Sequence, residues 1–336
     1  MQDLWQLPLP SLRGILPWTT LYQLPRLNPR NPTPLPPLTN IAPPEVEIIR
    51  PIYSVKVPFT IRWRSKRSIP SLTIKTLLAN DNRIQNFHLT PHGKFRQKRP
   101  DIENLLGICV VKKAPSMGEL KGALEYQFRP SQPQPNTGSW GKLGDVDPKI
   151  RQRFIQVLPY WRVTEKLEEL VATLDRYDDL RDQVAEVFTY VRKTVRPENL
   201  PGRKGVLQLL DEEIPYGDCD EYTDLTTAIL RVMGIPVRRV TGMVARNVVP
   251  GQEVRLESLH AWAEVYAPQI GTWVPVDPAL NIFGFWGKDI IPLMREGTRS
   301  DRLFLRATPR QAHPETYVQK EMEDPLVKLE LPTTDG

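Results

Sequence analysis

Cysteine is scarce in this chain, whose 336 residues include only Cys109 and Cys219. Two cysteines form one disulfide at most, which excludes a disulfide scaffold and favours a reducing compartment. No run approaches the about 18 uninterrupted apolar residues of a membrane-spanning helix, and the first residues lack the basic start and apolar run of a secretion signal. We therefore expect a soluble, cytoplasmic protein without a membrane partner.

Metal-binding and phosphate-binding motifs are missing as well. No Cys and His residues have metal-ligand spacing, no acidic loop resembles a calcium site and no glycine-rich loop is suited to a phosphate. We therefore predict neither a metal nor another cofactor. The content of 40% hydrophobic and 25% charged residues is that of an ordinary globular protein, and the length allows two domains.

Charge and proline are distributed unevenly along the chain. Residues 1–150 hold 21 Lys and Arg against 10 Asp and Glu, a net of +11, whereas residues 151–336 hold 24 against 29, a net of −5. The first 44 residues carry 11 of the 35 prolines. Proline removes backbone donors, so this segment is predicted to be an extended arm packed on the body, with a polyproline ligand as the alternative.

The next part of the chain changes to short runs of β-forming residues separated by Pro, Gly and Asn, which predicts an antiparallel β domain. In the clearest run, Val55–Arg64, apolar and polar residues alternate with the period of a half-buried strand. Cys109 lies inside another run and is interpreted as a core residue. The predicted strands are Val46–Arg50, Val55–Arg64, Leu72–Ala79, Arg83–Leu89, Leu106–Val111 and Ala123–Arg129.

Two groups of basic residues occur in this β domain, and either could bind nucleic acid or another polyanion. A solvated face explains them better, since Arg62 and Arg64 occupy the outward positions of an alternating strand and no nucleic-acid-binding motif accompanies them. Nucleic acid is therefore not the expected partner. The two groups are Arg62, Arg64, Lys66 and Arg67, and Lys94, Arg96, Lys98 and Arg99.

The second half of the chain shows first a helical and then a strand period. Thr164–Leu174 and Tyr177–Val195 carry apolar residues at three- and four-residue steps, which predicts two amphipathic helices. After Gly234 the period changes to two, and helices followed by strands indicate an α+β core. The predicted strands are Val237–Val244, Ser258–Tyr266 and Trp273–Val276.

These patterns divide the chain into five parts, of which the fourth is expected to carry the chemistry. They are a proline-rich arm at 1–44, an antiparallel β domain at 45–130, a linker at 131–148, an α+β domain at 149–286 and a C-terminal extension at 287–336. The linker is assigned from its abundance of Pro, Gly, Gln and Asn.

Cys219 stands at the start of a predicted helix that Gly234 ends. A thiol in the first helical turn feels the positive end of the helix dipole, which favours the reactive thiolate. Four acids near the helix start oppose this effect, and an ion pair with a protonated histidine is expected to outweigh them. These acids are Asp218, Asp220, Glu221 and Asp224.

His260 and Asp277 follow the cysteine in predicted strands. Alone, His260 would be interpreted as a buried strand histidine and Asp277 as a turn residue before Pro278. Together with Cys219 they have the residue types of a nucleophile, its base and the acid that orients the base.

Residues 155–285 resemble the core of the transglutaminase-like superfamily, whose members share a papain-like cysteine-enzyme fold with a Cys helix on an antiparallel sheet. The resemblance implies that Cys219 is the nucleophile, His260 the base and Asp277 the orienting group. It rests on the stretches GDCDEYTDLTTAILRVMGIPVRRVTG, LHAWAEVY and WVPVDPAL.

Such a triad is expected to attack an amide carbonyl of a peptide or protein substrate and to form a thioester acyl-enzyme. The backbone N–H of Cys219 is expected to hold the oxyanion together with a second donor, for which Tyr216 and Gln208 are weak candidates. Trp262 and Trp273 are interpreted as core residues. Asp224 and Glu264 are interpreted as structural.

Three functions are compatible with these residues. A cysteine peptidase or amidase resolves the acyl-enzyme with water, and this is the preferred interpretation. A protein-glutamine γ-glutamyltransferase would resolve it with an amine. A scaffold protein would use the basic β domain instead, but such a protein has no need to retain Cys219, His260 and Asp277.

Overall fold

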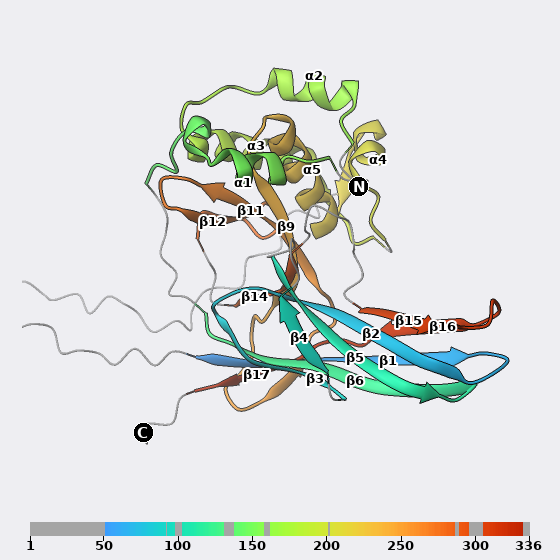
Figure 1. Cartoon of the computed structure of the whole chain (residues 1–336). Helices are drawn as coiled ribbons and strands as arrows, with labels where there is room; N and C mark the ends of the chain where they lie inside the picture. The colour runs from blue at the N-terminus through green and yellow to red at the C-terminus, as the bar shows by residue number, and fades with distance from the viewer. Residues whose placement is uncertain are drawn as a thin grey trace, which may run out of the picture. The chain divides into compact units, whose positions relative to one another are not determined.

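The computed structural model describes residues 51–91, 93–97, 103–130, 138–157, 162–200, 202–285, 289–295 and 305–331. Figure 1 shows these parts as ribbons. The predicted proline-rich arm and the predicted strand Val46–Arg50 lie outside the described residues.

The first part of the described chain forms two antiparallel β-sheets that share one hydrophobic core. In β1, Ile52–Arg64, the odd-numbered residues from Tyr53 to Trp63 are all buried, because alternate side chains of a strand point to one face. Cys109 is buried in the same core and its Sγ lies 2.9 Å from the carbonyl oxygen of Pro91, which confirms its interpretation as a core residue. The other strands of the first part are β2 (Ile69–Ala79), β3 (Ile84–Thr90), β4 (Lys94–Gln97), β5 (Asn104–Ala114) and β6 (Met117–Phe128).

Three strands from the end of the chain complete these two sheets. In Figure 1 they are the red arrows among the blue and green ones. β17, Leu326–Glu330, and β16, Tyr317–Met322, pair with successive stretches of β1, and β15, Leu305–Arg310, pairs with β2. These three strands, which lie in the segment predicted as a separate extension, are therefore structurally part of the β domain.

The α+β part consists of helices packed on a five-stranded antiparallel sheet with the order β13-β12-β11-β9-β14. Its central helix is α5, Cys219–Val232, which lies against β9 and β11 and is buried on all sides from Glu221 to Arg231. The remaining helices are α1 (Pro148–Phe154), α2 (Glu165–Thr173), α3 (Leu180–Thr194) and α4 (Val206–Asp211). The sheet strands are β9 (Val237–Val244), β11 (His260–Ala267), β12 (Thr272–Asp277), β13 (Ile282–Phe283) and β14 (Ile290–Arg295).

The end of the predicted linker belongs to this second core. Trp140 is fully buried and stacks on Phe283 with 5.2 Å between the ring centroids. Its carbonyl oxygen accepts a hydrogen bond from the backbone N–H of Gln269. Residues 138–147 therefore differ from the expected linker, because one aromatic side chain in a polar segment anchors it to the protein.

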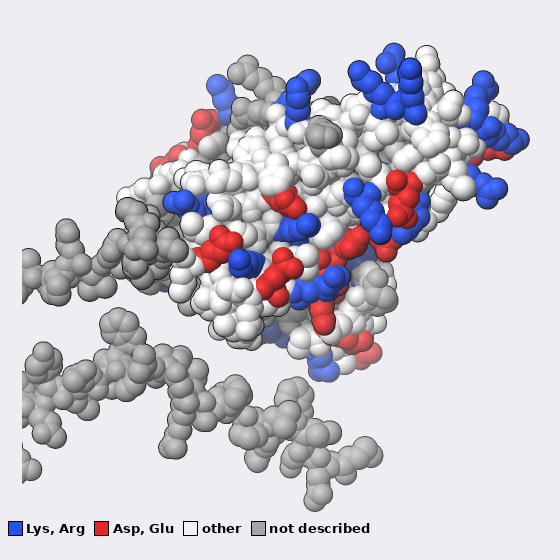
Figure 2. Space-filling model, turned by 90° about the horizontal axis from the view of Figure 1, so that it is seen from below, with Lys and Arg blue, Asp and Glu red and all other residues white. Residues whose placement is uncertain are grey.

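Two of the basic residues of the first group, Arg62 and Lys66, pair with neighbouring acids. Arg62 contacts Glu119 at 2.6 Å and Glu321 at 2.8 Å, and Lys66 lies 2.8 Å from Glu315. On the face shown in Figure 2, Asp and Glu lie among Lys and Arg over the middle of the surface. These pairs agree with a solvated face; Lys98 and Arg99 lie outside the described residues.

None of the helices in the described parts of the chain has the length and apolar character needed to cross a membrane.

Candidate active site

The turn before α5 places Cys219 at the first position of the helix. Asp218 is the N-cap, and its carboxylate accepts from the backbone N–H of Asp220 at 2.9 Å. Glu221 accepts from the backbone N–H of Asp218 at 3.1 Å, which completes a capping box. Gly217 is needed here, since a Cβ at that position would collide with the Glu221 side chain. The local sequence thus fixes where the helix starts and where the sulfur lies.

The other acids of the helix start are paired with arginines. Asp220 contacts Arg239, and Asp224 receives two hydrogen bonds from Arg203 at 2.5 and 2.6 Å. Arg239 also lies 3.4 Å from Asp224. The arginines balance the charge of these carboxylates and therefore reduce the electrostatic repulsion expected between them and a Cys219 thiolate.

His260 and Asp277 lie at the same end of two adjacent antiparallel strands of the five-stranded sheet. His260 opens β11 and Asp277 closes β12. Their side chains are joined by a 2.7 Å hydrogen bond between Nε2 and Oδ2. The other oxygen of Asp277 accepts from the backbone N–H of Leu280 at 3.0 Å, which fixes the carboxylate. Asp277 is buried, with a side chain that is 1% exposed, and His260 is 12% exposed.

Cys219 lies near enough to the His260 ring that its interaction with the imidazole helps to raise the His260 pKa. Since Asp277 occupies Nε2, the ring nitrogen left for the sulfur is Nδ1. Trp262 is fully buried and its ring stacks on His260 with 6.2 Å between centroids, which limits rotation of the imidazole. The three predicted side chains are thus brought together in the order sulfur, imidazole, carboxylate, while their catalytic roles stay a prediction.

The environment of His260 favours the imidazolium form. Burial alone would lower its pKa, but the hydrogen bonds and charges of Asp277 and Cys219 outweigh burial and raise the pKa to about 9. His260 therefore carries a proton at neutral pH. The pKa of His260 in the folded protein lies above its ordinary value of about 6.5. The pairing with Asp277 therefore contributes its full stabilisation at pH values below about 6.5. The stabilisation is lost as the pH rises through about 9.

We expect Asp277→Asn to lower the pKa of His260, because the substitution removes the carboxylate charge while burial of the ring remains. The chain has four histidines, so His260 can be assigned in NMR titrations by comparison with His260→Gln. The wild-type ring should titrate near pH 9 and the Asp277→Asn ring at a distinctly lower pH. A wild-type His260 that titrates at or below about 6.5 would contradict the arrangement.

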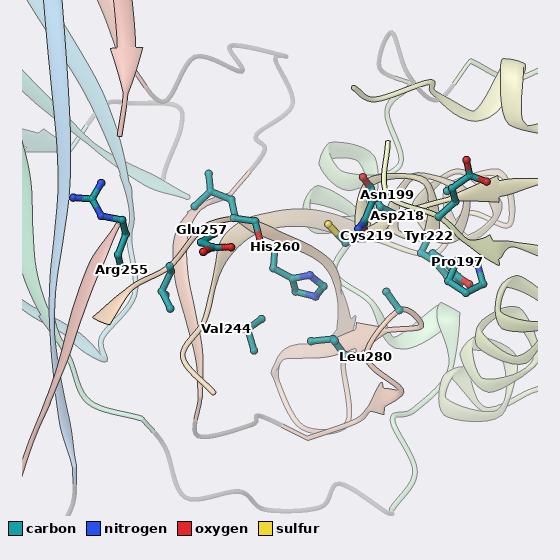
Figure 3. Close-up of a pocket in the computed structure, with 16 residues that line it drawn as sticks. Pro197, Asn199, Asp218, Cys219, Tyr222, Val244, Arg255, Glu257, His260 and Leu280 are labelled. Carbon is teal, nitrogen blue, oxygen red and sulfur yellow. The ribbon is translucent and has the colours of Figure 1, made fainter. Parts of the chain in front are cut away.

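A cleft of about 550 Å³ opens beside Cys219 and His260. Figure 3 shows the sulfur and the imidazole between two walls. One wall is the segment Pro197–Asn199, and the other is the loop Arg255–Leu259. Tyr222, Val244, Ala279 and Leu280 also line the cleft, together with Gly217 and Asp218.

The β domain supports one wall of this cleft. β10, Glu253–Arg255, pairs with β17 of the β domain, and the backbone N–H of Leu256 donates to the carbonyl of Pro325 at 2.8 Å. The end of the chain therefore positions the Arg255–Leu259 loop next to His260. Neither this loop nor Asn199 was expected at the site, since no motif marks them.

The two candidates for the second oxyanion donor lie outside the cleft lining. The Tyr216 ring is covered by the Lys204 ammonium, 3.1 Å from the ring centroid. Gln208 is an exposed residue of α4. The structure gives no support to either of them.

Among the described residues, one group of potential metal ligands occurs at the site, and it consists of Asp218, Cys219 and Asp220. Both carboxylates have other partners. Asp218 caps α5, and Asp220 pairs with Arg239.

Asp224 and Glu264 agree with the structural roles expected for them, whereas Trp273 is half-buried and is not part of the buried core. The Trp273 ring lies under the Arg238 guanidinium at 4.1 Å. Asp224 and Glu264 are buried in ion pairs.

Residues 168–278 match the Transglutaminase-like superfamily, so this part of the chain is a transglutaminase-like core. The uncharacterized protein YebA of Bacillus subtilis is 29% identical over 137 residues, which cover 35% of this chain and 18% of YebA. The uncharacterized protein Mb2599c of Mycobacterium bovis is 30% identical over 104 residues, 30% of this chain and 32% of that protein. The chain thus spans less than a third of the length of these curated relatives.

The likeness in fold extends beyond this core. One similar crystal structure is that of a protein from Cytophaga hutchinsonii, provisionally named a cysteine protease. The match covers 83% of this chain and 98% of the Cytophaga chain, with a TM-score of 0.51 and 12% sequence identity. At this identity the likeness concerns the fold alone. The α+β class predicted for the second half, with a β-rich region before it, is confirmed.

Proposed function

We propose that this protein is a cysteine hydrolase that cleaves amide bonds of peptides or proteins through a thioester acyl-enzyme. The observation that carries the proposal is the His260 ring held between Asp277 and Cys219 at the open cleft. A protonated imidazole next to a sulfur stabilises the thiolate, which is the nucleophilic form of cysteine.

The first half of the reaction forms the acyl-enzyme. The Cys219 thiolate attacks the amide carbonyl carbon, a C–S bond forms and the carbonyl electron pair moves to oxygen. When this intermediate collapses, the C–N bond breaks and His260 gives its proton to the leaving amine. Asp277 keeps the ring oriented and stabilises its charged form.

The second half returns the enzyme to its starting state. His260, now neutral, takes a proton from water, whose oxygen attacks the thioester carbon. The C–S bond then breaks, the carboxylic acid leaves and the sulfur is again paired with imidazolium. Cys219 is partly exposed at an open cleft, so water has access to the thioester, and we take water as the acyl acceptor.

Incubation of the protein with casein and a dansylated primary amine separates the three candidate functions. Hydrolysis predicts new peptides or released ammonia without dansyl incorporation. Incorporation of the dansyl group would show transamidation and would overturn the choice of water. If neither reaction occurs with casein, acylation of Cys219 by p-nitrophenyl acetate decides between a selective hydrolase and a scaffold.

A further inference from the structure

The start of α5 provides one free oxyanion donor. The first N–H groups of a helix have no partner within the helix. Here the Asp218 carboxylate accepts from the second and third of them, those of Asp220 and Glu221. The backbone N–H of Cys219 is left, with no hydrogen bond to another described residue. A thiolate attack on a carbonyl normally needs a second donor, because one hydrogen bond does not balance the charge that develops on oxygen.

The backbone on both sides of Asn199 is tied to the turn that precedes Cys219. β7, Arg196–Pro197, pairs in parallel with β8, Tyr216–Gly217. On one side of Asn199, the backbone N–H of Glu198 donates to the Gly217 carbonyl at 2.9 Å. On the other side, the backbone N–H of Leu200 donates to the Asp218 carboxylate at 3.4 Å. Both flanks of Asn199 are thus tied to the two residues that precede Cys219.

The Asn199 side chain lines the cleft together with Cys219. Figure 3 shows it on the Cys219 side of the cleft, with Arg255 on the far side. Its amide makes no hydrogen bond to another described residue. The other potential donors of the lining fit less well: the Tyr222 hydroxyl donates to the Val195 carbonyl at 2.6 Å, and Ser258 belongs to the loop of Arg255.

We propose that Asn199 is a catalytic residue whose side-chain N–H, with the backbone N–H of Cys219, binds the oxyanion formed when the sulfur attacks a carbonyl. This assignment rests on the proposed function. A neutral amide suits the task, because it donates a hydrogen bond to the oxyanion without placing a competing positive or negative charge beside the sulfur.

Two reactions of the same sulfur test the assignment. p-Nitrophenyl acetate acylates Cys219 through an oxyanion, and p-nitrophenolate leaves as the C–O bond breaks. Iodoacetamide alkylates the sulfur by displacement of iodide and forms no oxyanion. We expect Asn199→Ala to slow acylation by about 10²- to 10³-fold, the usual effect of losing one oxyanion donor, and to leave alkylation at its wild-type rate. Cys219→Ala gives the background of both reactions.

Gln208→Ala is the matched control, because it removes an exposed side-chain amide outside the cleft; both of its rates should equal those of the wild type. Asn199→Asp keeps the side-chain shape, replaces the donor by an acceptor and should slow acylation at least as much as Asn199→Ala. Wild-type acylation rates in both Asn199 variants would overturn the role of Asn199 but not the proposed function. A parallel loss of alkylation would also overturn it, since that pattern shows a disturbed sulfur. Absence of Cys219-dependent acylation in the wild type would instead overturn the proposed function.

Discussion

Cys219→Ala is expected to abolish acyl transfer and to leave the fold intact. Removal of the nucleophile from a triad costs about 10⁴- to 10⁶-fold in rate, because no other group forms the covalent intermediate. Alanine suits the first turn of a helix, and Asp218 still caps α5 through backbone N–H groups. The release of p-nitrophenolate and of casein peptides should both fall to background, with an unchanged circular dichroism spectrum.

Cys109→Ala is the matched control for the cysteine. Cys109 is buried in the β-domain core, and burial raises the pKa of its thiol, so it should not react. Removal of a small core side chain lowers stability slightly without affecting the cleft. Activity that survives in Cys219→Ala, or that disappears only in Cys109→Ala, would place the chemistry elsewhere.

Glu264→Gln is expected to cause a large loss of stability. Glu264 is fully buried, and its carboxylate lies 2.5 Å from Arg238 and 3.5 Å from Arg295. Arg238 also contacts Glu103 of the β domain, and burial lowers the pKa of its guanidinium. Without the Glu264 charge, Arg238 keeps Glu103, but Arg295 has to share Asp81 with Arg83. Three arginines are then left with two acids, and breaking such a network costs about 3–5 kcal/mol. This is a large part of the about 5–15 kcal/mol that holds a domain together.

Urea unfolding of Glu264→Gln and of Glu119→Gln measures this effect. Glu119 pairs with Arg62 on the exposed face of the β domain, so its substitution should leave the midpoint nearly unchanged. The Glu264 variant should unfold at a much lower urea concentration. Equal midpoints for the two variants would show that the buried ion pairs of Glu264 contribute no more to stability than an exposed pair does.

The elements with strong local patterns were predictable from the sequence. The alternation in Val55–Arg64 matches β1, and the helical spacing after Cys219 matches α5. β4 was not predicted, because three of its four residues, Lys94, Arg96 and Gln97, are polar. The strands β15, β16 and β17 were not predicted either. They are short, and their partners in β1 and β2 lie more than 200 residues earlier in the chain.

The candidate site was partly predictable for a similar reason. Cys219, His260 and Asp277 have residue types and local settings that indicate their chemistry. Asn199 has no such signal, since it sits in a loop whose position depends on the two-residue pairing of β7 with β8. The wall Arg255–Leu259 depends on a strand at the end of the chain. Long-range pairing of short segments leaves no periodicity for the sequence to reveal.

The rate of iodoacetamide alkylation at each cysteine, followed by peptide mass spectrometry at pH 6, tests most directly whether the imidazole of His260 keeps the neighbouring sulfur ionised. We expect rapid labelling of Cys219, almost none of Cys109, and loss of the rapid reaction in His260→Ala. Equal labelling of both thiols, or rapid labelling of Cys219 that persists without His260, would contradict it.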